Sequence, residues 1–220
     1  MHDPAKIDKP LIRVIDDDDA MRNSWAFLIE GEGWDVKTYA DAITFLSSND
    51  YIRPGCLLLE VRMPHMSGLE LQLKLREAGC DLPIIFISGH GDIDMAVKTM
   101  KDGADDFLSK PVTPERLLDA IEKAVKRDAR IRTESAALEQ ARAAFRRLSA
   151  REQEVAMGVA RGLLNKQIAY ELNISEKTVI AHRSSLCKKL GARTAADITR
   201  MLMTIDPDAI TGAPAPADGE

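Results

Sequence analysis

Residues 57–64 read LLLEVRMP, a run of leucines that meets a single charge at Glu60. A short apolar run without alternation is typical of a parallel strand covered by helices on both faces. Similar runs recur along the first half of the chain and alternate with helical patterns. This alternation predicts an α/β domain with a doubly wound, five-stranded parallel sheet. The predicted strands span residues 11–15, 35–39, 56–61, 83–88 and 105–109.

Capping residues mark the starts of helices. Ser67 and Glu70 form a capping box ahead of one helix, and Thr113 precedes Pro114 at the start of another. The second helix continues to about residue 147, with an apolar residue at every seventh position. The other apolar position of each heptad is mostly polar, which indicates a weak coiled-coil seam. Two interpretations stay open: a signalling helix that pairs when the domains come together, and a charged linker helix.

The last part of the chain has only helical patterns. Ser149 and Glu152 form another capping box, and glycines separate the helices that follow. The helices over 165–172 and 176–190 are joined by a three-residue turn. Two short helices joined in this way predict a small all-α helix-turn-helix domain.

Charge is distributed unevenly along the chain. Residues 1–145 hold 19 Lys and Arg against 26 Asp and Glu, whereas residues 146–205 hold 11 against 5. A basic segment beside an acidic one suggests that the second domain binds a polyanion, although a solvated helical surface has the same composition. The tail over 206–220 is acidic, rich in Pro and Ala, and predicted to be disordered.

The composition is that of an ordinary cytoplasmic protein, with 45% hydrophobic and 30% charged residues among 220. No apolar stretch reaches the roughly 18 residues of a membrane helix, and the N-terminus lacks the apolar core of a signal peptide. We therefore expect no membrane association. The three cysteines are scattered, without metal or redox spacing, and are interpreted as reduced packing residues.

Polar side chains stand where four predicted strands end. Asp16 and Asp17 follow the first strand, Glu60 and Ser88 lie at the ends of the third and fourth, and Lys110 follows the fifth. The carboxyl ends of parallel strands share one edge of the sheet, so these groups are expected to converge in one cleft.

Clustered carboxylates repel one another and need a cation. Hard oxygen ligands suit Mg²⁺, which keeps some of its waters and favours a phosphate partner. The alternative is that the acidic run over 16–19 is a solvated segment that caps the following helix. Either way, the sequence places a concentration of negative charge at this edge.

Several motifs together resemble a known family. VIDDD, LLLEVRMPHMSG, FISGHGD and DFLSKP look like the receiver domain of two-component response regulators, over residues 10–126. LSAREQEV to MLMTI, residues 148–205, is similar to the LuxR-type helix-turn-helix, with a helical linker over 127–147 between the two. The whole chain resembles a transcription regulator of the NarL/FixJ type, partnered by a sensor histidine kinase. The resemblance implies Mg²⁺ ligands at Asp16, Asp17 and Glu60, phosphoryl contacts at Ser88 and Lys110, and an aromatic switch at Phe107 that turns inward with Ser88.

Glu60 departs from the family pattern, which has a phosphorylated aspartate there. Glutamate moves the carboxylate by about one carbon–carbon bond, roughly 1.5 Å, so ordinary phosphoryl transfer is expected to be lost or slowed. The longer side chain also carries a negative charge toward the position of a phosphoryl group, within reach of Lys110. Three interpretations stay open: constitutive mimicry of the phosphorylated state, silencing or control by another input, and retained phosphorylation on glutamate.

The second helix of a helix-turn-helix enters the major groove of double-stranded DNA, and residues 176–190 are predicted to do so. Leu172, Ile174, Val179, Leu186 and Leu190 are assigned to its buried side. The residues expected near the bases are Lys177, Ile180, Ala181, Arg183 and Ser184. The residues expected at phosphates are Lys166, Thr178, Lys188 and Lys189.

One recognition helix covers few base pairs, so a homodimer on two half-sites is expected when the protein is active. Residues 195–205 carry an apolar stripe that serves either pairing or the core. Two other function classes are alternatives to a transcription regulator: an enzyme and a protein-interaction adaptor. A Mg²⁺-dependent phosphatase would need a second acid to protonate the leaving group, and the sequence offers none, so the protein is predicted not to be an enzyme. An adaptor would keep the helix-turn-helix fold but would no longer bind DNA.

Overall fold

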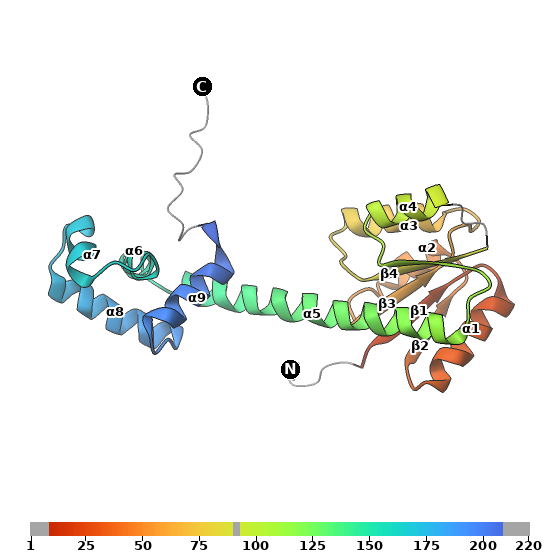
Figure 1. The fold of residues 1–220 in the computed structure, drawn as a ribbon, viewed down its shortest axis with the longest axis horizontal. Coiled ribbons are helices and arrows are strands. Elements are labelled where there is room, and N and C mark those ends of the chain that lie inside the picture. The colour runs from red at the N-terminus through yellow and green to blue at the C-terminus, as the bar shows by residue number, and fades with distance from the viewer. Residues whose placement is uncertain (1–8, 90–92, 209–220) are drawn as a thin grey trace, which may run out of the picture. The chain divides into compact units, whose positions relative to one another are not determined.

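The computed structural model of the protein describes residues 9–89 and 93–208. The chain divides into two compact units, Met1–Arg132 and Thr133–Glu220, and the boundary falls inside helix α5 (Pro114–Arg146). The elements of both units are labelled in Figure 1. Each unit encloses its own hydrophobic core, so each has its own basis for stability.

The first unit contains the predicted sheet. All pairings are parallel, and the strand order is β2-β1-β3-β4-β5, which confirms a doubly wound fold. The third strand ends two residues earlier than predicted, so Glu60 lies just beyond the sheet and not within it. The strands are β1 (Leu11–Ile15), β2 (Asp35–Tyr39), β3 (Gly55–Leu59), β4 (Ile84–Ser88) and β5 (Asp106–Ser109).

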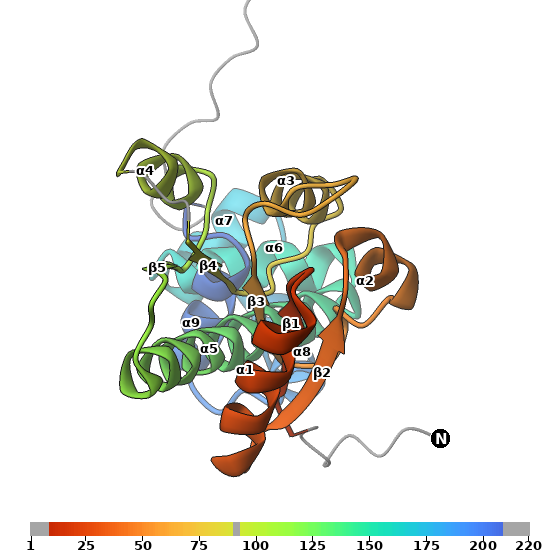
Figure 2. The same ribbon diagram turned by 90° about the vertical axis from the view of Figure 1, so that its right-hand side faces the viewer.

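Helices cover both faces of this sheet, as Figure 2 shows. One face packs against α1 (Asp19–Gly31) and the first half of α5. The other packs against α2 (Ala42–Ser48), α3 (Gly68–Glu77) and α4 (Ile93–Lys101). The three central strands are buried along their whole length, which explains why their sequences are apolar except for Arg13 in β1 and Ser88 at the end of β4.

The heptad pattern of α5 has a local explanation. Leu117 and Ala124 are buried against the sheet, and the polar residue Asp128, 3% exposed, accepts a hydrogen bond from the backbone N–H of Gly55 at 2.9 Å. Arg132 donates to both oxygens of Asp128 at 2.9 Å. The polar residue that weakened the predicted seam therefore fastens the helix to the start of β3.

A buried arginine holds the loop before β3. Arg13 in β1 is fully buried, and its guanidinium donates to backbone carbonyl oxygens of Leu11, Asp50, Arg53 and Pro54 at 2.6 to 3.4 Å. Burial lowers the pKa of Arg13, although the nearby acidic groups oppose the shift. The loop is thus anchored by a cation whose donors are met by carbonyl oxygens.

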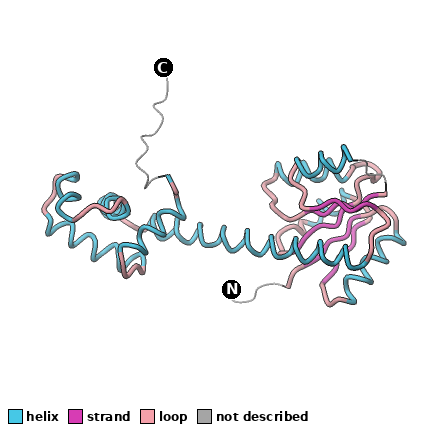
Figure 3. The backbone as a smooth tube through the Cα atoms, in the orientation of Figure 1, coloured by secondary structure: helices cyan, strands magenta, loops and turns pink. Residues whose placement is uncertain are grey.

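The second unit is helical, and all strands of the described residues lie in the first (Figure 3). Val179 and Leu186 are fully buried, with Leu172, Ile174 and Leu190 packed beside them, so the buried side of the recognition helix is as predicted. Capping boxes at Ser67 and Ser149 are also confirmed. The helices are α6 (Ala150–Ala160), α7 (Asn165–Leu172), α8 (Glu176–Leu190) and α9 (Ala195–Ile205).

Two further expectations concern the C-terminal tail and membrane-spanning helices. Of the tail predicted to be disordered, residues 209–220 lie outside the described residues. Within the described ranges, no helix has the length and apolar character needed to cross a membrane.

Candidate functional site at the acidic sheet edge and on helix α8

Four strands end at the side chains that were expected to converge. Asp16 and Glu60 directly follow β1 and β3, Ser88 is the last residue of β4, and Lys110 follows β5. Backbone hydrogen bonds tie these ends together. The N–H of Glu60 donates to the carbonyl of Ile15, and the N–H of Lys110 donates to that of Ser88, both at 2.9 Å. The parallel sheet therefore positions the site through its backbone.

The ammonium of Lys110 bridges two buried carboxylates. Its Nζ lies 2.9 Å from Oδ2 of Asp16 and 2.8 Å from Oε2 of Glu60. Burial disfavours the charged form of Lys110, but hydrogen bonds to Glu60 and Asp16 outweigh it, so the pKa of Lys110 is raised. One positive charge is thus shared by two negative side chains that are 5% and 9% exposed.

The second oxygen of Glu60 is held by the backbone. Oε1 accepts hydrogen bonds from the N–H groups of Val61 at 2.7 Å and Arg62 at 3.2 Å. Both oxygens of the carboxylate therefore have donors, two from the loop after β3 and one from Lys110. Hydrogen bonds to an ionised acceptor are among the stronger ones in proteins, so this arrangement fixes the side chain in place.

The three residues predicted to bind Mg²⁺ differ in exposure and in their partners. Asp17 is exposed, whereas Asp16 and Glu60 are buried and joined by Lys110. Among residues 9–89 and 93–208, no three His, Cys, Asp or Glu side chains are grouped closely enough to hold a metal ion. The donor atoms have the right chemistry for Mg²⁺, but an ammonium holds the two buried carboxylates.

The acidic run after β1 is divided: Asp16 is buried at the sheet edge, whereas the exposed residues after it include the cap of α1, as the alternative interpretation held. Asp18 is the N-cap, and its carboxylate accepts from the N–H groups of Ala20 and Met21. The remaining Oδ1 of Asp16 accepts from the N–H of Asp18 at 2.9 Å, and Arg22 donates to the carbonyl of Asp16 at 2.6 Å. The contact of Arg22 could not be predicted from the sequence, because a single arginine in the first turn of a helix belongs to no recognisable motif.

The two remaining predicted residues of this edge differ in burial. Ser88 is fully buried, whereas Phe107 is half-buried, with its ring centre 6.4 Å from that of Phe86. Phe107 also lines a surface pocket of about 560 Å³ together with Val97 and Met100. The inward turn of Phe107 stays a prediction.

Helix α8 presents a narrow exposed stripe. Successive residues of a helix are about 100° apart, so Lys177, Ile180, Ala181, Ser184 and Lys188 fall within one arc. All five are exposed, and the side chain of Ile180 is 52% exposed. The stripe therefore has two lysines at its ends and small or apolar residues between them.

Two cations stand on the flanks of this stripe, and each has a protein partner. Lys189 donates to the buried carboxylate of Glu152 at 2.6 Å, and Ser185 donates to the other oxygen of Glu152 at 2.6 Å. On the other flank, Arg183 is half-buried and donates to the amide oxygen of Asn165 at 2.6 Å. Arg183 therefore does not share the fully exposed stripe in which it was predicted.

Glu152 ties three segments together. It closes the capping box at Ser149 and also accepts from α8 through Lys189 and Ser185. The hydrogen bonds from Lys189, then Ser185, then the backbone N–H of Ser149, lower the pKa of Glu152 to about 2. This pairing argues against a phosphate contact by Lys189, whose charge is balanced inside the unit.

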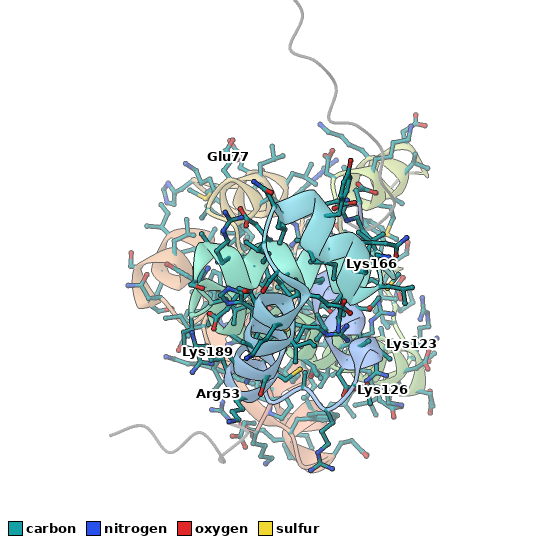
Figure 4. All side chains as sticks on the ribbon, turned by 90° about the vertical axis from the view of Figure 1, so that its left-hand side faces the viewer. Arg53, Glu77, Lys123, Lys126, Lys166 and Lys189 are labelled. Carbon is teal, nitrogen blue, oxygen red and sulfur yellow. The ribbon has the colours of Figure 1, made fainter. Side chains whose placement is uncertain are left out.

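The other predicted phosphate contacts differ in availability. Lys166 at the start of α7 is exposed, as are Lys177 and Lys188, and the described residues offer these three lysines no ion-pair partner. Thr178 is half-buried, and its hydroxyl lies 2.7 Å from that of Ser175, the N-cap of α8. Figure 4 shows Lys166 and Lys189 projecting on different sides of this unit.

Sequence reasoning missed Asn165 and the second role of Glu152. Glu152 was recognised only as the fourth residue of a capping box, because its partners on α8 are more than 30 positions away. Asn165 carries no motif of its own. Its only signal is its position at the first turn of a helix that precedes the recognition helix.

Comparison with known proteins gives matches to both units. The family model described as response regulator receiver domain matches residues 12–122, and that of bacterial regulatory proteins, luxR family, matches residues 146–202. Response regulator protein TmoT of Ectopseudomonas mendocina is 44% identical, over 87% of each chain. Transcriptional regulatory protein FixJ of Rhizobium meliloti is 38% identical, over 87% of this chain and 94% of that protein.

Solved structures agree with these matches. The response regulator StyR superposes with a TM-score of 0.81 at 42% identity, over 89% of this chain and 98% of that one. Full-length FixJ from B. japonicum superposes with a TM-score of 0.56 at 37% identity, over 90% of this chain and 97% of that one. The likeness therefore extends across both units and the helix between them.

Proposed function

Because this chain belongs to the two-component response regulators of the NarL/FixJ type, with a receiver and a LuxR-type DNA-binding domain, we propose that Glu60 sets its signalling state. In this proposal the chain regulates transcription as a homodimer on double-stranded DNA. The negative charge of Glu60 takes the part of the phosphoryl group that a sensor histidine kinase would otherwise supply. Dimer formation then needs no phosphoryl transfer.

One observation carries this proposal: the carboxylate of Glu60 is held at both oxygens. It accepts from Lys110 at 2.8 Å and from the N–H groups of Val61 and Arg62. An acidic group on the side chain of residue 60, directly after β3, therefore has one cationic donor and two backbone donors within hydrogen-bond distance. A phosphoryl group at the same edge would need donors of this kind.

Charge limits how closely Glu60 imitates a phosphoryl group. A carboxylate carries one negative charge, whereas a phosphoryl group carries about 1.5 to 2 near pH 7. Lys110 is also shared with Asp16, so Glu60 does not engage it alone. We therefore expect a partial shift of the receiver toward its active form.

The same sharing favours a second candidate, in which Glu60 disconnects the switch. Lys110 stays between the two carboxylates, and Phe107 is half-buried beside the surface pocket. In that case the receiver stays in its inactive form, and any activity depends on another input.

Solution mass separates the two candidates. Light scattering would be applied to the protein as it stands, to Glu60→Gln, and to Glu60→Asp with and without a small acyl phosphate and Mg²⁺. Under the proposal, the glutamate form is dimeric, whereas Glu60→Gln and donor-free Glu60→Asp are monomeric. A monomeric glutamate form, with a Glu60→Asp variant that dimerises only with donor, would establish the disconnected switch.

DNA binding tests the wider proposal against an enzyme or an adaptor. The double variant Lys166→Ala with Lys188→Ala removes two exposed cations that have no ion-pair partner among the described residues. We expect duplex binding to weaken and its salt dependence to decrease. Binding that ignores salt, or no binding by either the unaltered protein or Glu60→Asp treated with acyl phosphate and Mg²⁺, would exclude a DNA-binding regulator.

Helix α5 is proposed to couple the two domains. Residues 133–137 are all exposed, between the anchored part that ends at Arg132 and Ala141, which is buried again. Two glycines inserted after Ser135 would interrupt the helix where it is least packed. We expect the DNA affinity of the variant to become independent of residue 60 while both domains stay folded. A dependence that persists would exclude this role.

A further inference from the structure

The two flanks of α8 each carry a cation, but their electrical environments differ. Lys189 is held by the carboxylate of Glu152, so its charge is cancelled within the protein. Arg183 is held by the amide oxygen of Asn165, which is neutral. The hydrogen bond to Asn165 therefore fixes the position of the Arg183 guanidinium without neutralising its positive charge.

The direction of Arg183 separates it from the exposed stripe. With about 100° between successive residues, Arg183 lies roughly 120° from the centre of the arc defined by Lys177, Ser184 and Lys188. It faces the start of α7, where Asn165 is followed by the exposed Lys166. A helix seated in the major groove turns its central arc to the bases and its flanks to the phosphates on either side.

Geometry also suits Arg183 to a phosphate. A guanidinium has five N–H donors in a planar fork, and within the described part of the chain Asn165 accepts from Nη1. A side chain already held by one hydrogen bond loses less freedom when it binds, which favours tight contact.

We propose that Asn165 is a positioning residue that holds Arg183 as a phosphate-binding fork on the flank of α8. This inference rests on the proposed DNA binding. Arg183 then supplies affinity and register, and the choice of base falls to Lys177, Ile180, Ala181 and Ser184. Because Ile180 and Ala181 are apolar, that choice relies on contacts such as those with thymine methyl groups.

The test compares two duplexes bound by the full-length protein. One duplex is selected by the unaltered protein from a randomised pool, and the other is a scrambled sequence of equal length. Fluorescence anisotropy gives Kd for each from about 50 to about 300 mM salt, a range in which phosphate contacts dominate the change.

For Arg183→Ala, we expect Kd to rise by about tenfold per protomer near 0.1 M salt, equally on both duplexes. The slope of log K against log salt is negative, and its magnitude should decrease by about 0.9 per protomer. A loss of discrimination between the duplexes, with the slope unchanged, would show that Arg183 reads a base and overturn the inference.

The role of Asn165 needs a second comparison. Asn165→Ala should weaken binding less than Arg183→Ala and keep the salt slope, because the charge remains. In the Arg183→Ala background, Asn165→Ala should add nothing. Equal effects of Asn165→Ala in both backgrounds would mean that it acts separately from Arg183 and overturn its positioning role.

Lys189→Met is the matched control, since it removes the cation from the opposite flank. Its salt slope should equal that of the unaltered protein, measured at a temperature where circular dichroism shows the variant folded. A slope reduced as much as in Arg183→Ala would contradict the difference between the flanks. If the unaltered protein enriches no duplex from the randomised pool, the proposed function fails, which is distinguishable from failure of this inference alone.

Discussion

Each unit of this protein contains a buried glutamate paired with a lysine, at the sheet edge of the receiver and in the core of the DNA-binding domain. Glu60 and Lys110 are 2.8 Å apart, and Glu152 and Lys189 are 2.6 Å apart. Both glutamates also accept backbone N–H groups. The local chemistry is almost the same, yet the two pairs have different consequences.

The difference lies in what surrounds each pair. Glu152 satisfies the first turn of α6 and joins it to α8, so its charge is balanced one to one within the fold. Lys110 instead serves two carboxylates, Asp16 and Glu60, so the sheet edge keeps an excess negative charge. Removing one partner of a balanced buried pair leaves an uncompensated charge and destabilises the domain strongly, whereas an unbalanced pair remains responsive to other charges.

Removing the balanced pair should have the largest effect. Glu152→Ala removes the capping box, leaves Ser185 without its acceptor and leaves Lys189 unpaired. We expect the thermal transition of the DNA-binding domain to be lost, with that of the receiver unchanged, as followed by circular dichroism. Glu154→Ala is the control, because the partner of Glu154 among the described residues is the exposed Arg151, and it should leave both transitions in place.

Lowering the pH should reduce the stability of the DNA-binding domain in the unaltered protein, as part of the effect of Glu152→Ala. The pKa of Glu152 is about 2 in the folded protein against an ordinary value of 4.5, so its contribution is complete above pH 4.5. It is lost as the pH falls from there toward 2. Urea unfolding of Glu152→Gln should show a much weaker pH dependence over that window. Parallel curves for the variant and the unaltered protein would place the titrating group elsewhere.

Glu60→Gln should have a smaller effect, because Lys110 keeps Asp16 as its partner. We expect a loss of about 2 kcal/mol in receiver stability, the usual range for a hydrogen bond to a charged group. The pKa of Lys110 is raised in the folded state, so the stabilisation from the pair is present below its ordinary value of 10.5 and is lost as the pH rises through the folded value. Denaturant unfolding of both forms at neutral and strongly alkaline pH measures this difference.

Substitutions in the capping boxes should have the smallest effect on stability, since each removes only a contact within the first turn of one helix. Ser67→Ala removes the hydroxyl that accepts from the N–H of Glu70, and Ser149→Ala does the same ahead of Glu152. Each should reduce the stability of its own domain by about 1 kcal/mol. A much larger loss for Ser149→Ala, in denaturant unfolding, would mean that the cap and the Lys189 pair are cooperative.

Local patterns made much of the fold predictable. The helix over Glu176–Leu190 was found because capping and periodicity depend only on neighbours in sequence. The end of β3 was misplaced because pairing with β1 and β4 sets it: the pairing runs only as far as Leu59.

Partners distant in sequence account for what was missed at the sites. Asp128 looked like a polar break in a seam, but its partner Gly55 lies 73 positions earlier. Arg183 was placed among the base contacts because its bond to Asn165, 18 positions away, leaves no trace in the local pattern. Lys110 was correctly expected at the acidic edge, yet its place between two carboxylates depends on three strands.

The backbone bonds of Glu60 have a consequence for spectroscopy. Because the N–H groups of Val61 and Arg62 donate to an ionised oxygen, their amide protons should resonate at low field and exchange slowly with solvent. A shorter aspartate at position 60 would release at least one of them. Two assigned cross-peaks would therefore report the state of the acidic edge in the intact protein, without DNA, phosphate donor or a measurement of mass.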